Sequence, residues 1–311
     1  MDPKGVDGQD QIAGYYDVKR HVRDVITHHL LHRVMARKRG RRSGILLHGP
    51  PGTGKTTLAM LVAATFPTVT VYSATSSDIM DRYTGMSERN VRGLFVVAAS
   101  TTPSMIIFDD MEEMFGTRRE DTAEGGDAER VKIELLAMMT LYKDVIVMGI
   151  TNLPWMVDRA LLRRFQARIH VGLPDEKTRR AVLKLRLDVP TKGVDLDALV
   201  KSSDGMTGDA IEQAVTEADQ DDIGEILAKA THFRALTWKG ETKYIPYDAS
   251  DQGAKKRAIE DLPDDSLFLR VITGEALYKA LQNQSQLTVN PKETDEKHLK
   301  WQTNPWTQGD L

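Results

Sequence analysis

The spacing of apolar residues divides the chain into a strand-rich first half and a mainly helical second half. Between Tyr15 and Lys38, apolar residues recur three or four positions apart, which predicts an amphipathic helix. Short, unbroken apolar runs follow, and such runs are typical of strands that are buried on both faces. These runs are GILLHG, TVTVYS, SMIIFDD, DVIVMGIT and ARIHVGL.

Helical patterns separate most of these runs, as in GKTTLAMLVAATF and ERVKIELLAMMTLY. Buried strands that alternate with helices predict a parallel sheet with helices on both faces. We therefore expect an α/β fold, with a large domain of three layers that is built on a five-stranded parallel sheet and ends near Pro174.

Beyond Pro174 the pattern indicates a small helical domain that carries a short β insertion. Residues 175–230 have helical periodicity, THFRALTWKGETKYIPYD reads as a hairpin or short strands, and GEALYKALQNQ returns to helix. The last residues are polar apart from Trp301 and Trp306, and we expect a loosely held tail. The expected parts are a flexible N-terminus at 1–11, a large domain at 12–174, a helical domain at 175–289 with its insertion at about 234–262, and a polar tail at 290–311.

Composition narrows the class of protein. The chain has 311 residues, of which 41% are hydrophobic and 28% are charged, and its net charge is −3, so no global field favours nucleic acid or an anionic membrane. It has no cysteine, which excludes disulfides and cysteine-based metal sites. The N-terminus does not resemble a signal peptide, and no apolar run is long enough to cross a bilayer. The basic cluster Arg37–Arg42 reads as a solvated turn, with an acidic partner or nucleic acid as the alternative.

The stretch GPPGTGKT, from Gly49 to Thr56, matches the phosphate-binding P-loop pattern completely. It lies between a predicted strand and a predicted helix, where backbone N–H groups and the helix dipole favour phosphate. Lys55 is expected to reach the terminal phosphates, and Thr56 to ligate magnesium. The expected nucleotide-binding residues of this loop are Pro51, Gly52, Thr53, Gly54, Lys55, Thr56 and Thr57.

Polar residues at the ends of two later strands complete the candidate site. Asp109 ends the run SMIIF and is expected to hold magnesium, usually through water. Asn152 ends another strand, where its amide can orient the attacking water or touch the γ-phosphate. Arg163 and Arg164 read either as a solvated pair or as arginine fingers for a neighbouring subunit, which would require head-to-tail packing into a ring or helix.

Taken in order, these motifs resemble those of AAA+ ATPases, in the clade that includes katanin, spastin and the vacuolar-protein-sorting ATPase that disassembles ESCRT-III. The similarity covers nearly the whole chain from Ile12 and includes IAG, GILLHGPPGTGKTTLA, SSDIMDRYTGMSERNVRGLF, PSMIIFDDMEE, GITNLPWMVDRALLRRFQARI and DGMTGDAIEQAV. It implies ATP and Mg²⁺ as ligands, with the backbone of Ile12 and Gly14 at the adenine. It also implies that Arg82 and Tyr83 form a pore loop that grips extended polypeptide.

The C-terminal quarter resembles the β-domain and final helical region of the vacuolar-protein-sorting member, and katanin and spastin lack that β insertion. The resemblance implies an unfoldase that forms a homo-hexameric ring and pulls ESCRT-III-like filament proteins through its pore, with an activator that binds the β-domain. It further implies a cytoplasmic protein that reaches endosomal or other membranes transiently through its partners, and no nucleic-acid partner. A microtubule-severing ATPase is the alternative within the clade.

The sequence departs from the family in three places. No segment of it resembles the family's N-terminal microtubule-interacting-and-trafficking domain, either because the sequence is trimmed or because the protein recruits substrate differently. Its tail diverges after Val289, and Asp110 stands where the family has the glutamate that polarises the attacking water. Aspartate is one methylene shorter, and misplacement by about 1 Å can slow a reaction on the order of 100-fold. We therefore expect ATP binding with slow hydrolysis, and a non-hydrolysing scaffold is the alternative. Glu112, two residues later, is expected to point elsewhere.

Overall fold

The computed structural model describes residues 14–34, 44–81, 83, 85–115, 125–187, 191–192, 194–219, 232–238, 240–247, 255–257, 261–263, 266, 272–287 and 290–303. The chain forms two compact units. Unit 1 comprises Met1–Pro174 together with Asn290–Leu311, and unit 2 comprises Asp175–Val289.

Unit 1 is built on a five-stranded sheet in the order β2-β3-β4-β1-β5, and every neighbouring pair in it is parallel. This confirms the α/β fold with a five-stranded parallel sheet that the apolar runs predict. The order places β1 between β4 and the edge strand β5, so the segment after β1 leaves from an interior strand of the sheet. The strands are β1 Gly44–His48, β2 Thr70–Ala74, β3 Ser104–Phe108, β4 Val145–Thr151 and β5 Phe165–His170.

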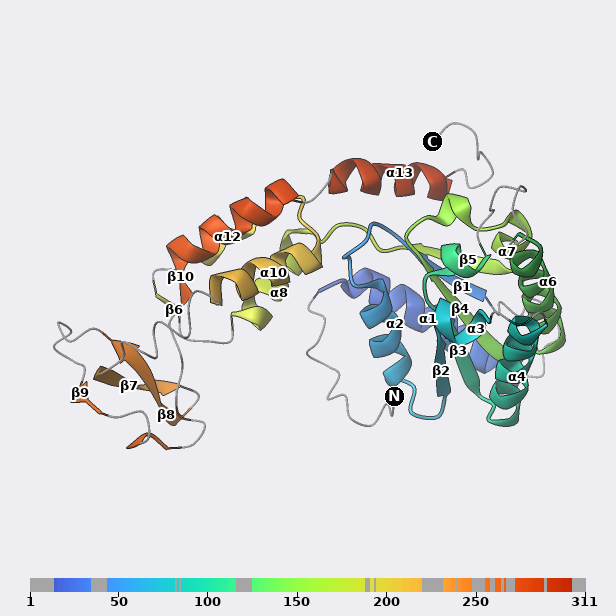
Figure 1. Cartoon of the computed structure of the whole chain (residues 1–311), viewed down its shortest axis with the longest axis horizontal. Helices are drawn as coiled ribbons and strands as arrows, with labels where there is room; N and C mark the ends of the chain where they lie inside the picture. The colour runs from blue at the N-terminus through green and yellow to red at the C-terminus, as the bar shows by residue number, and fades with distance from the viewer. Residues whose placement is uncertain are drawn as a thin grey trace. The chain divides into compact units, whose positions relative to one another are not determined.

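Helices cover both faces of this sheet, as Figure 1 shows. Along β3 the side chains alternate between two cores: Met105 and Ile107 pack with α1 and α2, whereas Ile106 and Phe108 pack with α4, α5 and α6. Because both faces are buried, the strand is apolar at each of these positions. The helical segments of this part are α1 Tyr16–Val34, α2 Lys55–Ala64, α3 Ser76–Ile79, α4 Met86–Ser100, α5 Met111–Phe115, α6 Gly125–Leu141, the 3₁₀ turn η2 Pro154–Met156 and α7 Arg159–Leu162.

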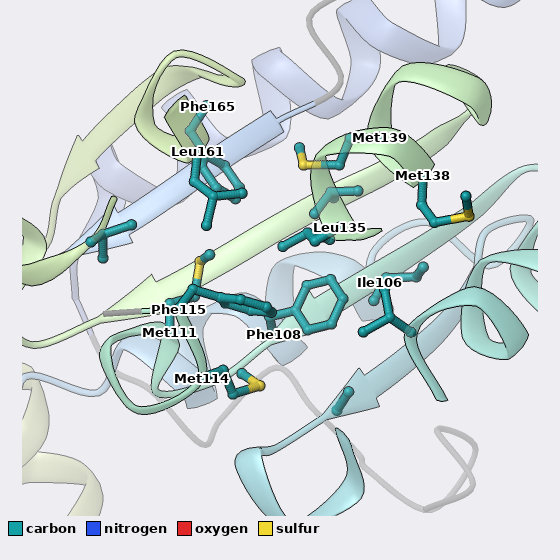
Figure 2. Close-up of a cluster of buried hydrophobic side chains, with 14 of the residues drawn as sticks. Ile106, Phe108, Met111, Met114, Phe115, Leu135, Met138, Met139, Leu161 and Phe165 are labelled. Atoms are coloured by element: carbon teal, nitrogen blue, oxygen red, sulfur yellow. The ribbon is translucent and has the colours of Figure 1, made fainter. Parts of the chain in front are cut away.

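The core between the sheet and α4, α5 and α6 is rich in aromatic and methionine side chains, and Figure 2 shows part of it. Phe108 on β3 and Phe115 on α5 meet edge to face, with ring centroids 5.8 Å apart. Both rings are buried. The short helix α5 is therefore fixed to the strand that precedes it, which places the intervening residues Asp109 and Asp110 at a defined corner of the sheet.

The end of the described chain differs from the loosely held tail expected at 290–311. Pro291–Thr303 form helix α13, which packs against β5 and η2 of unit 1. His298 and Trp301, one helical turn apart, are both fully buried. The expectation is wrong for residues 290–303 because two aromatic side chains on one face are enough to anchor an otherwise polar helix. Trp306 lies outside the described residues.

Unit 2 has a helical core and two small sheets. Its buried residues include Leu183, Leu199, Ile211, Leu277 and Leu281. β7 pairs antiparallel with β8 and with β9, and β6 pairs parallel with β10. The helices are α8 Glu176–Arg186, α9 Leu196–Ser202, α10 Gly208–Asp219 and α12 Gly274–Leu287, and the strands are β6 Thr191–Lys192, β7 His232–Trp238, β8 Glu241–Tyr247, β9 Lys255–Lys256 and β10 Ile272–Thr273.

Two helices of unit 2 are each preceded by an aspartate that caps the N-terminus of the helix. The Asp175 carboxylate accepts a hydrogen bond from the Thr178 N–H, and Asp195 accepts from Asp197 and Ala198. Among the helices described in either unit, none has the length and apolar character needed to span a bilayer.

Candidate functional site

The loop between β1 and α2 has the backbone conformation of a phosphate-binding loop. Gly52 and Gly54 have φ angles of 75° and 80°, a left-handed region that glycine enters without steric cost. The Thr53 hydroxyl donates to the Pro50 carbonyl at 3.0 Å, which closes the turn. The loop leads directly into α2 at Lys55, so its amides and the N-terminus of that helix form a site that favours an anion. Pro51, within the motif, and Thr57, just after it, are exposed.

Lys55 is held against this loop by its own backbone. Its Nζ donates to the carbonyls of Gly49 at 2.9 Å and Pro50 at 2.7 Å, and the side chain is buried. Burial lowers the pKa of Lys55 to about 8, and the nearby carboxylates, chiefly Glu112, act in the opposite direction. The ammonium is therefore charged at neutral pH and suited to pair with a phosphate.

Thr56, in the first turn of α2, lies in contact with Asp109, which directly follows β3. The Thr56 hydroxyl donates to Asp109 Oδ2 at 2.8 Å. A hydroxyl and a carboxylate are the hard oxygen ligands that Mg²⁺ prefers, and they lie beside the loop where phosphates would bind. The residues present therefore fit a magnesium ion, and Mg²⁺ bound here would neutralise charge on the phosphate oxygens.

Asp110 and Asn152 also lie at this corner. The Asn152 side-chain amide donates to Asp110 Oδ1 at 3.3 Å, and the Asp110 N–H donates to Asp109 Oδ1 at 3.0 Å. Asp110 has a φ of 51°, an uncommon value for a residue with a side chain and one that is found often at functional sites. The Asp110 side chain is largely exposed, and the partial loss of its hydration, together with the charges of Asp109 and Glu112, raises the pKa of its carboxyl.

Glu112 belongs to the same group, contrary to the expectation that it points elsewhere. Its Oε1 accepts a hydrogen bond from the backbone N–H of Asn152 at 2.9 Å. The two-residue separation from Asp110 does not reveal this contact, because α5 begins only at Met111 and the backbone at Asp110 is left-handed. The contact depends on where α5 lies against the end of β4, which the local sequence does not indicate.

Arg163 and Arg164 do not join this group. They are exposed and follow α7, immediately before β5 begins. β5 runs parallel to β1 and pairs Phe165 with Gly44 and His170 with His48. The two arginines therefore sit at the amino end of the sheet and the P-loop at the carboxyl end, separated by the length of a five-residue strand, about 17 Å.

The remaining predicted residues lie away from the phosphate loop or outside the described chain. Tyr83, between α3 and α4, is 77% exposed, and its N–H donates to Asp81 Oδ1 at 2.9 Å. Gly14 is buried, with a φ of 79°. Ile12, Arg82 and the basic cluster Arg37–Arg42 lie outside the described residues.

Three histidines from distant parts of the sequence stack next to the P-loop. His48 ends β1, and its ring centroid lies 5.3 Å from that of His170 and 5.5 Å from that of His298. The Nδ1 atoms of His48 and His298 are 3.3 Å apart, and Trp301 meets the His48 ring at 4.8 Å. Among the described residues, no group of three or more histidine or acidic side chains is arranged to hold a metal ion.

We expect this histidine cluster to make unit 1 acid-sensitive. Burial lowers the pKa of His48 to about 2, and nearby His170, His298, Lys55 and Arg168 act in the same direction. Burial also lowers the pKa of His298 to about 3, where His170 and Lys55 act in the same direction and Asp295 acts against it. Unfolded histidine takes up protons near pH 6.5, so the free energy of unfolding falls as pH drops from about 6.5 toward 3. Each extra proton that the unfolded state binds lowers the free energy of unfolding by about 1.4 kcal/mol per pH unit.

An acid titration followed by tryptophan fluorescence tests this expectation, because Trp155 and Trp301 both contact His298 or His48. The variant His298→Gln should lose stability less steeply with acid than the wild type. His21→Gln serves as the matched control, because His21 is exposed on α1. An acid transition of His298→Gln with the steepness of the wild type would contradict the expectation.

Comparisons with known proteins agree with this geometry. Residues 45–173 match the family model "ATPase family associated with various cellular activities (AAA)". The chain is 34% identical over 268 residues to vacuolar protein sorting-associated protein 4B of Pongo abelii, covering 81% of this chain and 60% of that protein. It is 33% identical to protein 4A of Homo sapiens with the same coverage, and 31% identical to protein 4 of Dictyostelium discoideum over 73% of this chain and 52% of that protein.

The chain thus spans about 60% of the length of the first two relatives. The matched segment runs from β1 through β5 and contains the phosphate-binding loop, Asp109 and Asn152. An AAA domain implies nucleotide binding, in accord with the buried lysine and the left-handed glycines described above. The parallel sheet, the P-loop and the family match together show that residues 45–173 form a domain of the AAA ATPase family.

Proposed function

We propose that the chain is a ring-forming ATPase that disassembles ESCRT-III-like filaments by pulling polypeptide through a central pore. The observation that carries the ATPase part is the meeting of Lys55, Thr56 and Asp109 at the carboxyl end of the parallel sheet, next to Asn152. The similarity to the vacuolar protein sorting-associated proteins supports the choice of substrate.

In this proposal the P-loop amides and the Lys55 ammonium bind the phosphates of ATP. Thr56 and Asp109 would hold Mg²⁺, as their oxygen ligands allow. Asp110 accepts a proton from the attacking water as general base, and Asn152, which donates to the Asp110 carboxylate, orients that base. Ile12 and Gly14 would contact adenine through their backbone.

Hydrolysis is proposed to be slow because Asp110 is shorter than the glutamate it replaces. Its left-handed backbone gives a second reason, since the carboxylate leaves the chain in a direction that an ordinary strand end would not give it. The same two features favour a second candidate function, an ATP-binding AAA scaffold that hydrolyses little or no ATP.

The position of the two arginines supports assembly into a ring. Arg163 and Arg164 lie at the opposite end of β5 from the P-loop of their own chain, so they are suited to reach the γ-phosphate of a neighbouring subunit. A contact in which each subunit offers these residues to the next is head-to-tail, and such contacts close into rings when the rotation permits. We propose a homo-hexamer that forms with nucleotide.

Tyr83 is the proposed substrate-gripping residue, together with Arg82. An exposed aromatic ring can pack between the side chains of an extended peptide without requiring a particular sequence. The antiparallel sheet of β7, β8 and β9 is the proposed docking surface for an activator, and it favours filament disassembly over microtubule severing. We place this activity in the cytoplasm, at endosomal or other membranes reached through partners.

The test combines ATP turnover with filament release. Turnover per subunit should rise with protein concentration, because a site completed by a neighbour works only in the assembly. Tyr83→Ala should abolish ATP-dependent release of subunits from ESCRT-III-like filaments. The variant Tyr16→Ala, which removes a similarly exposed tyrosine on α1, should release them as the wild type does.

Three results would contradict the proposal. ATP binding without turnover at any concentration would favour the scaffold. Equal filament release by Tyr83→Ala and wild type would exclude the pore role. Stimulation of turnover by tubulin, and not by filament proteins, would favour a severing ATPase.

A further inference from the structure

The short helix α5 is seated directly on β4, the strand that ends at the candidate site. A Cβ atom added to Gly149 on β4 would lie 2.0 Å from the Met111 sulfur, so any other residue at 149 would force the Met111 side chain to move. Met111 is fully buried in this position. The next residue of α5, Glu112, is thereby brought to the end of β4.

Glu112 uses one carboxylate oxygen to hold the backbone of Asn152. Its Oε1 accepts from the Asn152 N–H at 2.9 Å. Its other oxygen, Oε2, is buried and makes no hydrogen bond within the described part of the chain. The Asn152 N–H and the nearby Lys55 ammonium are groups that can stabilise this partly buried carboxylate. A carboxylate held by a backbone N–H at the end of β4 can do more than pack α5 against the sheet.

Asn152, whose backbone is held by Glu112, in turn restrains the side chain of Asp110. Its side-chain amide donates to Asp110 Oδ1 at 3.3 Å, so the same residue is fixed by Glu112 through its backbone and fixes Asp110 through its side chain. Asp110 itself is exposed and reaches the site from a left-handed backbone. Without the Asn152 amide, a short and exposed carboxylate would sample several rotamers.

The lengths of the two acidic side chains match these tasks. Glu112 needs its extra methylene to span from α5 to the end of β4; aspartate at this position would retract the carboxylate by about 1.5 Å, beyond hydrogen-bond reach of the Asn152 N–H. Asp110 is the shorter residue, and it needs an external group to hold it. The chain therefore places the longer carboxylate at the anchoring position and the shorter one at the reacting position.

We propose that Glu112 is a positioning residue for ATP hydrolysis, which fixes Asn152 and, through its side-chain amide, the carboxylate of Asp110. This inference rests on the ATPase activity proposed above. It assigns Glu112 no contact with the nucleotide, so it concerns the rate of the chemical step and leaves ATP affinity to the P-loop.

The experiment measures steady-state ATP turnover and the affinity for a fluorescent ATP analogue in Glu112 variants of the whole chain. Glu112→Ala should lower kcat on the order of 100-fold, the effect of misplacing a catalytic group by about 1 Å, with little change in KM. Glu112→Gln keeps an oxygen acceptor for the Asn152 N–H and should retain more activity than Glu112→Ala. Glu112→Asp should resemble Glu112→Ala because it lacks reach. Glu113→Gln, on the exposed side of α5, is the control.

A double-mutant cycle with Asp110→Glu separates positioning from general damage to the fold. A longer carboxylate at 110 should raise kcat above that of the wild type and depend less on Asn152. The loss caused by Glu112→Ala should then be smaller in the Asp110→Glu background than in the wild type.

Three results of these measurements would contradict the proposed role of Glu112. Equal kcat in Glu112→Ala and wild type would overturn the inference and leave the proposed ATPase standing. A loss of nucleotide affinity or of melting temperature that accounts for the fall in kcat would overturn it as well, because it would indicate a structural role only. A wild type without turnover would overturn the proposed ATPase and this inference together.

Discussion

Replacement of Lys55 by alanine should weaken ATP binding on the order of 100-fold and remove measurable turnover. A charge-assisted hydrogen bond contributes about 1.5–3 kcal/mol, and each 1.4 kcal/mol is about tenfold in affinity. Lys55 is buried at the P-loop with its ammonium on the carbonyls of Gly49 and Pro50. Its removal takes away the cation and also leaves these two carbonyls without their donor, so the loop loses support before any nucleotide arrives.

Titration with a fluorescent ATP analogue measures the effect on affinity, and a coupled phosphate assay measures turnover. Lys143→Ala, an exposed lysine just before β4, should bind the analogue as the wild type does. Lys55→Arg should also bind weakly, because a planar guanidinium does not fit the space of a buried ammonium. If Lys55→Ala retained the affinity of the wild type, the assignment of the loop as the phosphate site would be wrong.

Trp301→Ala should be the most destabilising single substitution in α13. Truncation of a fully buried tryptophan costs about 3–5 kcal/mol, which for a unit of this size lowers the melting temperature by roughly 10 °C. Trp301 packs edge-on against His48 at 4.8 Å, and the Arg168 guanidinium lies 5.9 Å from its ring. The cavity would open beside the strand that leads into the P-loop, so the binding site should lose rigidity together with the helix.

Calorimetry gives the melting temperature, and amide exchange across residues 291–303 shows whether α13 detaches. Leu299→Ala is the matched control, since Leu299 lies on the same helix and is 48% exposed. Its cost should stay within about 0.5 kcal/mol. Trp301→Phe should fall between the two, because phenylalanine fills part of the space. Equal melting temperatures for Trp301→Ala and Leu299→Ala would show that α13 does not dock through Trp301.

Features that lie within one short stretch of sequence could be predicted. The five strands follow from unbroken apolar runs, because a strand buried on both faces is apolar at nearly every position. The P-loop follows from GPPGTGKT, because its glycines, lysine and threonine act on one ligand from neighbouring positions. The roles of Asp109 and Asn152 were predicted from their places at strand ends, and the structure brings both to the same corner.

Features that depend on how distant segments meet could not be predicted. The order of the strands in the sheet is one, since an apolar run does not indicate which other strands will lie next to it. The docking of α13 is another: its sequence is polar, and only the contact of His298 with His48, 250 residues earlier, makes one face a core face. The placement of Glu112 is a third, because it depends on the close packing of Met111 at Gly149. Local sequence determined which side chains end each strand and line the phosphate-binding loop. Tertiary packing decided which of these side chains are in contact, because only packing fixes distances between separate elements.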